Sequence, residues 1–209
     1  MKYSMHLHQG QLKNPPTQAF KLLDDQLVIF LRGWGSQDYN QKFVDEITHF
    51  LSTAQADIEV TSPFDYLESL SSLANKVRIA LLLAHDYFYK SENKTFFSIG
   101  FETTILMRQK KELAWGTVGR FSIHQVDSQQ GLHVLSDVGT DRDKYILLPI
   151  ELLGVEKDVE IRCGSFHVEQ KNFIVSSCYN TPLTTELIQD ERASSGINSN
   201  YWFSKIALD

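Results

Sequence analysis

Two neighbouring stretches of helical character constrain the fold of this chain most. From Asp38 to Thr53 apolar residues recur at helical spacing, and a second stretch begins at Ser62–Pro63 and keeps one apolar face as far as about Phe88. Proline is common in the first turn of a helix, where its missing N–H leaves no hydrogen bond unmade. Strand-like sequence lies on both sides of this pair. The chain is therefore predicted to be an α+β protein whose two long helices pack on a sheet.

The segments around the helices have the alternation and the turn signals of β-strands. Two short strands are expected on either side of Pro15–Pro16, because neither proline can join a ladder. A third is expected at Gln26–Arg32, where a continuous apolar centre predicts burial on both faces. Further strands separated by polar or glycine turns are expected beyond Asn93. The prediction is completed by a strand pair at 158–168 and 172–177, a short helix from about 184 to 193, and a last strand from 201.

Composition limits the kinds of partner and the compartment. The chain has 209 residues, of which 42% are hydrophobic, enough to bury the core of one large domain. The net charge is −6, and no basic cluster exceeds Arg108–Lys111, which argues against a nucleic-acid surface. The two cysteines, Cys163 and Cys178, and the absence of a signal peptide indicate reduced thiols in a cytoplasmic protein. The run Ile79–Ala84 is far too short to span a membrane, so no membrane partner is expected.

Two longer stretches carry a resemblance to a known family. Residues 102–126 read "ETTILMRQKKELAWGTVGRFSIHQV", and residues 148–177 read "LPIELLGVEKDVEIRCGSFHVEQKNFIVSS". The first resembles the Thr-Thr strand, hairpin and Val-Gly-Asp-Ser-Arg turn of the metal-dependent type 2C (PPM-type) serine/threonine protein phosphatases. The second resembles that family's Leu-Gly-Val segment, paired strands and the strand before its Ser-Asp-Gly motif. The likeness runs from about Ser4 to the end of the chain.

The resemblance implies both a fold and a site. The fold is a four-layer α-β-β-α sandwich of two mostly antiparallel sheets, built by a single domain over 1–209 with a shortened flap near 136–147. In that family, aspartates at strand ends hold two divalent cations, which activate a bridging water for attack on a phosphoryl group. The positions that match those ligands here are Gln18, Arg32, Cys178 and Ser199. Because no metal-binding aspartate remains at them, the resemblance implies that no metal or other cofactor is held.

Arg32 is the most unusual of these positions. It follows the apolar run of "LVIFLRGWGS", at the point where the strand opens into a glycine turn. A guanidinium stays protonated, so Arg32 could stand where a dication sits in active relatives; like charges 4 Å apart repel by roughly 4 kcal/mol at a dielectric of about 20. The family's upstream phosphate-binding basic residue matches Lys13. Lys13 and Arg32 are therefore candidates for an anion site, the alternative being that Arg32 pairs with a local carboxylate and Lys13 is a solvated charge.

Two classes of function follow. The first is a catalytically inactive phosphatase-like protein, or pseudophosphatase, that regulates or binds another protein such as a kinase, a phosphoprotein or a subunit of an assembly. The second is a divergent phosphoprotein phosphatase in which Asp38, Glu102 or Asp141 recruits a metal in a rearranged way. Binding of a divalent metal and turnover of a phosphoester distinguish the two.

Overall fold

The computed structural model describes residues 1–8, 15–56, 62–126, 131–137, 151–168, 173–178 and 201–208. These residues form two five-stranded sheets and two long helices, so the predicted α+β class is confirmed. All strand pairs within the two sheets are antiparallel across the described residues. The chain divides into two compact units: unit 1 comprises Met1–Pro15, Arg120–Pro149 and Glu169–Asp209, and unit 2 comprises Pro16–Gly119 and Ile150–Val168.

The sheet of unit 2 has the strand order β2-β3-β4-β5-β8. Its strands are β2 (Gln18–Leu22), β3 (Leu27–Gly35), β4 (Ile99–Gln109), β5 (Glu112–Val118) and β8 (Arg162–His167). β3 is flanked by a strand on each side, and its whole apolar run is buried. The continuous hydrophobic pattern of this strand therefore did indicate burial on both faces.

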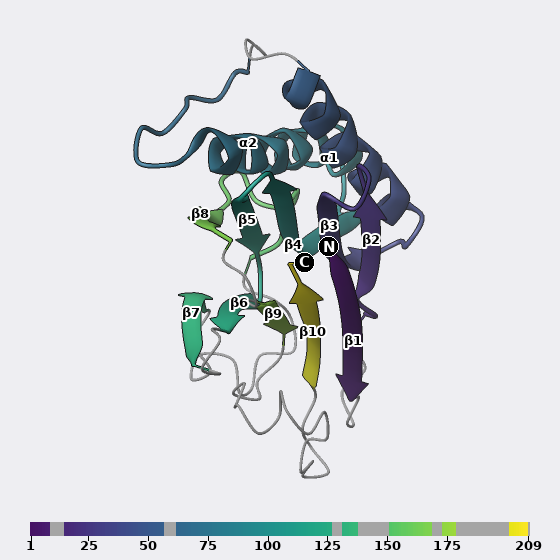
Figure 1. The fold of residues 1–209 in the computed structure, drawn as a ribbon. Coiled ribbons are helices and arrows are strands. Elements are labelled where there is room, and N and C mark those ends of the chain that lie inside the picture. The colour runs from purple at the N-terminus through teal and green to yellow at the C-terminus, as the bar shows by residue number, and fades with distance from the viewer. Residues whose placement is uncertain are drawn as a thin grey trace. The chain divides into compact units, whose positions relative to one another are not determined.

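Helices cover one face of this sheet (Figure 1). α1 (Tyr39–Ala56) contacts β3, whereas α2 (Ser72–Tyr87), which continues as the π-helical turn η1 (Phe88–Glu92), contacts β4, β5 and β8. Because side chains alternate along a strand, every second residue of β3 joins the core beneath the helices, and the residues between them face the other side. The core members from β3 are Leu27, Ile29 and Leu31. Arg32 belongs to the opposite face.

α2 begins at Ser72 and not at Ser62–Pro63, so the predicted helix start was wrong. The Ser71 hydroxyl caps the first turn by accepting a backbone N–H at 3.1 Å. The buried Asn75 amide holds the preceding segment in an irregular path, because it accepts the Leu67 N–H and donates to the Leu67 carbonyl, both at 2.9 Å. Side-chain hydrogen bonds thus replace helical ones before Ser71.

The sheet of unit 1 has the order β1-β10-β9-β6-β7, which places the first and last strands side by side. Its strands are β1 (Lys2–His8), β6 (Phe121–Val126), β7 (Leu132–Ser136), β9 (Phe173–Cys178) and β10 (Tyr201–Ala207). The strands predicted as a pair near 158–177 are present as β8 and β9, but they belong to different sheets. β8 pairs with β5, whereas β9 pairs with β6 and β10.

Two further expectations concern other parts of the chain. The short helix predicted near 184–193 lies outside the described residues, as does most of the shortened flap expected near 136–147. Within the ranges that the structure describes, no helix is both long and apolar enough to cross a membrane.

Candidate functional site

The glycine turn at the end of β3 forms the frame of the candidate site. Gly35 has a φ of +138°, and a Cβ there would lie 2.2 Å from the Ser98 carbonyl oxygen. Only glycine therefore allows β3 to run this close to the start of β4 before the chain turns into α1. The turn places the last residues of β3 beside the first turn of α1.

Arg32 and Glu102 form a buried ion pair at this end of the sheet. They are register partners on β3 and β4, and both side chains are fully buried. The Arg32 Nη1 atom lies 3.1 Å from Glu102 Oε2, and Trp34 Nε1 donates to the same oxygen at 2.8 Å. The other terminal nitrogen of Arg32 donates to Thr17 Oγ1 at 3.0 Å. The guanidinium is thus held by a carboxylate of β4 and by the residue just before β2.

A glycine on the next strand connection makes room for this pair. Gly119 follows β5 with a φ of +81°, and a Cβ there would lie 2.5 Å from Glu102 Cγ. Any other residue at this position would collide with the glutamate and would also adopt a backbone conformation that side chains disfavour. The absence of a side chain at Gly119 therefore leaves the space that the Glu102 side chain occupies, and Glu102 balances the charge of Arg32.

Gln18 belongs to a second polar network next to the ion pair. Its Oε1 atom accepts a hydrogen bond from Asn40 Nδ2 at 3.2 Å, and the same amide nitrogen donates to Gln37 Oε1 at 2.7 Å. Gln37 in turn donates to the Gly33 carbonyl at 2.9 Å. These amides link β2, the end of β3 and the first turn of α1. Their hydrogen bonds are all between neutral groups.

The predicted site residues are only partly covered by the described ranges. Gln18 and Arg32 do lie near one another, since Arg32 contacts Thr17, the neighbour of Gln18. Cys178 ends β9, but its side chain is outside the described part. Lys13, Ser199 and Asp141 lie outside the described residues, so the anion site at Lys13 and Arg32 stays a prediction.

The acids considered as replacement ligands have separate surroundings. Asp38 is exposed and accepts a hydrogen bond from the Ser36 hydroxyl at 3.1 Å, whereas Glu102 is buried against Arg32. The alternative considered for Arg32 was that it pairs with a local carboxylate, and Glu102 is that carboxylate. Sequence reasoning missed the parts that Thr17 and Trp34 play in holding the pair. The signal for Trp34 was its spacing of two from Arg32, which places both on the same face of a strand.

The side chains at the described ligand positions do not suit a divalent cation. Gln18 offers an amide that already accepts a hydrogen bond, and Arg32 offers a permanent positive charge, whereas hard cations are held mainly by carboxylates and other oxygen donors. Across the described ranges, no group of three or more histidine, cysteine, aspartate or glutamate side chains is arranged to hold a metal. The two-metal chemistry of active phosphatases therefore has no fitting donor set in this part of the site.

Comparison with known proteins places the fold. No protein-family model and no curated protein matches the chain by sequence. Among solved structures, the serine/threonine phosphatase PstP/Ppp of Mycobacterium tuberculosis matches with a TM-score of 0.64 at 10% identity, covering 100% of this chain and 98% of that one. PppA, a key regulatory component of T6SS in Pseudomonas aeruginosa, matches with a TM-score of 0.63 at 13% identity, covering 98% and 96%.

A third structure agrees with these two. The PPM Ser-Thr phosphatase MsPP of Mycobacterium smegmatis, in complex with cacodylate, matches with a TM-score of 0.61 at 10% identity, covering 100% of this chain and 99% of that one. Identities this low carry no information about catalysis, but the matches span both chains almost completely. The chain therefore has the fold of the PPM-type serine/threonine phosphatases, as its sequence resemblance implied.

Proposed function

We propose that the protein is a pseudophosphatase: a catalytically inactive type 2C phosphatase-like protein that acts as a cytoplasmic regulatory or protein-binding module. The observation that carries this proposal is the buried Arg32–Glu102 pair at the end of β3. The family resemblance puts the central metal ligand of active phosphatases at the position of Arg32. A permanently charged guanidinium cannot ligate a metal.

The pair also removes Glu102 from the set of available ligands. Its Oε2 atom already accepts hydrogen bonds from Arg32 and Trp34. A dication approaching this oxygen would have to displace both donors, and the guanidinium would repel it by roughly 4 kcal/mol at 4 Å and a dielectric of about 20. Loss of two-metal catalysis follows from this chemistry, since no bridging water would be activated.

The finer part of the proposal concerns what the protein binds in place of a substrate. A phosphate group is the anion that Lys13 and Arg32 together would suit. The two terminal nitrogens of Arg32 already donate to Glu102 and Thr17, so a bound phosphate would share these donors or replace the Thr17 hydroxyl. The expected partner is another protein, such as a kinase, a phosphoprotein or a subunit of a larger assembly.

Calorimetry and an activity assay on one sample test the proposal. The full chain, freed of metal with EDTA, is titrated with manganese and with magnesium, and the same sample is assayed with p-nitrophenyl phosphate. We expect no heat of specific binding and no turnover with either metal. Saturable manganese binding accompanied by turnover would overturn the proposal in favour of a divergent phosphatase. Asp38→Asn and Asp141→Asn variants would then identify which acid holds the metal.

A further inference from the structure

Two adjacent phenylalanines stand in solvent between η1 and β4. Phe96 is 72% exposed and Phe97 is 55% exposed. Single exposed apolar residues are common on protein surfaces, whereas two exposed rings on neighbouring residues offer apolar area of the kind that protein contacts use. Lys94, which is also exposed, lies two residues before Phe96. We call residues 94–97 the aromatic loop.

The base of the aromatic loop is held rigidly. The Asn93 side chain donates to the carbonyls of Ile99 and Gly154, at 2.7 and 2.6 Å, and accepts the N–H groups of Ser98 and Ile99, at 2.8 and 3.1 Å. Glu92 precedes it and is bound by Lys42 at 2.6 Å, a contact that holds the pKa of Glu92 below its usual value. Because both ends of the loop are fixed by these contacts, less conformational entropy is lost when its rings are buried by a partner than for a loop with free ends.

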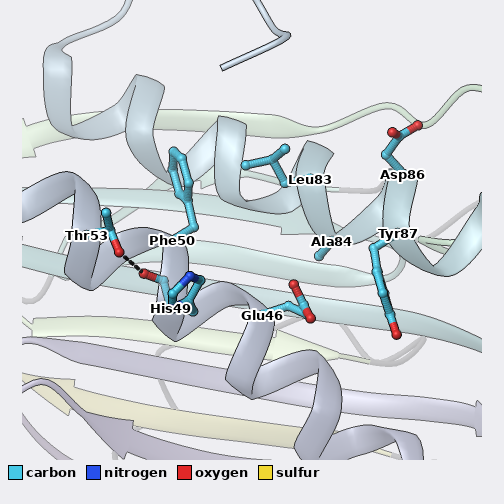
Figure 2. A pocket seen from close by; sticks show the side chains of 8 residues that line it. All are labelled: Glu46, His49, Phe50, Thr53, Leu83, Ala84, Asp86 and Tyr87. Atoms are coloured by element: carbon cyan, nitrogen blue, oxygen red, sulfur yellow. Dashed lines mark hydrogen bonds between the residues drawn. The ribbon is translucent and has the colours of Figure 1, made fainter. Parts of the chain in front are cut away.

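A groove of suitable size lies between α1 and α2 (Figure 2). Its volume is about 420 Å³, and its apolar lining comes mainly from Phe50, Leu83 and Ala84. A cavity of about 150 Å³ is enough to hold one benzene molecule. The groove between α1 and α2 therefore has room for two phenyl rings.

The charge at the groove complements the aromatic loop. Two acids, Glu46 and Asp86, line the groove together with its apolar residues and with His49, Thr53 and Tyr87. Asp86 is already paired with Lys90 at 2.7 Å, whereas Glu46 has no ion-pair partner among the described residues. Lys94, two residues before Phe96, carries the charge opposite to that of Glu46. The loop and the groove thus share apolar character, and each carries one charge that the other complements.

We propose that the protein self-associates through these two surfaces, with Phe96 and Phe97 of one copy entering the α1–α2 groove of a second copy and Lys94 meeting Glu46. All of these residues belong to unit 2, and none of them takes part in the Arg32 site. The contact joins two different surfaces of the chain, a loop on one copy and a groove on the other. It goes beyond the proposed function and does not depend on the loss of catalysis.

Sedimentation equilibrium of the full chain over a range of micromolar concentrations, at about 0.15 M salt, measures this association. We expect the average mass to rise above that of the monomer as concentration increases. The double variant Phe96→Ser, Phe97→Ser should weaken association by about thirtyfold or more, because central aromatic contacts dominate such interfaces. Tyr66→Ser is the matched control, since it removes another ring that is 50% exposed and should leave the association unchanged.

Charge reversal tests the pairing of the two surfaces directly. Glu46→Lys and Lys94→Glu should each weaken association by about two- to fivefold, as expected for an exposed ion pair, and the two changes together should restore it. A mixture of two variants gives a second test. The Phe96→Ser, Phe97→Ser variant lacks the rings but keeps the groove, and a Leu83→Arg variant has a blocked groove but keeps the loop. The mixture should associate although neither variant does so alone.

Three results would overturn the proposal: a wild-type chain that stays monomeric, double-serine variants that associate like wild type, or charge reversals that are not restored in combination. Circular dichroism of each variant establishes that it is folded. The swap of Glu46 and Lys94 keeps the test decisive even if Leu83→Arg unfolds the helix pair.

Discussion

Arg32 is tolerated in the interior because Glu102 lies directly opposite it across β3 and β4. Removing one partner of a fully buried pair leaves the other charge without compensation. Glu102→Gln should therefore lower the free energy of unfolding by about 3–5 kcal/mol. Urea-induced unfolding of wild type and variant measures this difference.

The control for this prediction replaces both charges at once. The double variant Arg32→Met, Glu102→Leu removes the charges together with their desolvation penalty. Its free energy of unfolding should fall by less than that of Glu102→Gln, because apolar residues of similar size often match a buried ion pair, even though Trp34 and Thr17 each lose a hydrogen-bond partner. A loss in Glu102→Gln no larger than in the double variant would mean that the pair is well solvated, contrary to the structure.

His85 is a second buried residue whose charge state depends on its contacts. Its Nδ1 atom accepts the Gly154 N–H at 3.0 Å, and its Nε2 atom lies 3.3 Å from the Lys157 carbonyl, to which the neutral ring donates. Burial lowers the pKa of His85, while its hydrogen bond to the Lys157 carbonyl and the charges of Asp86 and Asp158 act in the other direction. The folded pKa thus lies below the unfolded value of about 6.5. The stability that this histidine contributes is complete above that value and falls as the pH drops towards the folded pKa.

The pH dependence of unfolding tests the role of His85. His85→Asn keeps an acceptor near the Nδ1 position but cannot take up a proton. From about pH 8 to about pH 5, wild type should lose more stability than this variant. His133→Asn, a change at an exposed histidine, serves as the control and should follow wild type. Parallel curves for wild type and His85→Asn would show that His85 does not titrate on unfolding.

Among the elements, α2 depends on its cap for its starting point. The Ser71 hydroxyl accepts an N–H of the first turn and is bonded to the Ser165 hydroxyl of β8 at 2.9 Å. Ser71→Ala should lower the free energy of unfolding by about 1 kcal/mol, as for other lost N-caps. Ser71→Thr keeps the hydroxyl and should lose less than half of that amount. Thermal unfolding of both variants measures the two losses. Equal losses of stability in Ser71→Ala and Ser71→Thr would mean that the capping hydrogen bond is not the cause.

The elements also show what sequence periodicity can and cannot predict. The strand at 27–32 and the presence of two helices followed from local patterns, because apolar spacing depends only on neighbouring residues. The start of α2 did not, since it depends on the hydrogen bonds that Asn75 makes to Leu67, eight residues earlier. The separation of β8 from β9 likewise depends on ladders with strands far away in the sequence.

The candidate site shows the same division. A charge at the end of a buried strand was visible in the sequence, and so was the glycine turn beside it. That Glu102 is the partner of Arg32 depends on the register of β3 against β4, which joins residues 70 positions apart. Because two helices separate β3 from β4 in the sequence, no tight turn fixes this register locally. The identity of the Arg32 partner therefore could not be predicted from the sequence and is known only from the strand pairing of the structure.

For the whole molecule, the path of the chain determines how the two units can unfold. Five consecutive stretches alternate between unit 1 and unit 2, so the chain crosses from one unit to the other four times. Each unit is built from two or three separate stretches of the chain. If one unit unfolded, the stretches that form the other would be joined by an unfolded segment. The prediction of a single domain over 1–209 thus becomes a prediction about cooperativity: both units should unfold in one transition.

The three tryptophans report on the units separately. Trp34 and Trp115 belong to unit 2, and Trp202 belongs to unit 1. Fluorescence of a Trp202→Phe variant follows unit 2 alone, and that of a Trp34→Phe, Trp115→Phe variant follows unit 1 alone. Far-UV circular dichroism measures how much each variant's substitutions change its stability, and each fluorescence midpoint is corrected for that change. The corrected urea midpoints of unit 1 and unit 2 should coincide, because different probes of one two-state transition agree. Midpoints that remain apart would mean that the units unfold independently and that the chain is two domains despite its alternating path.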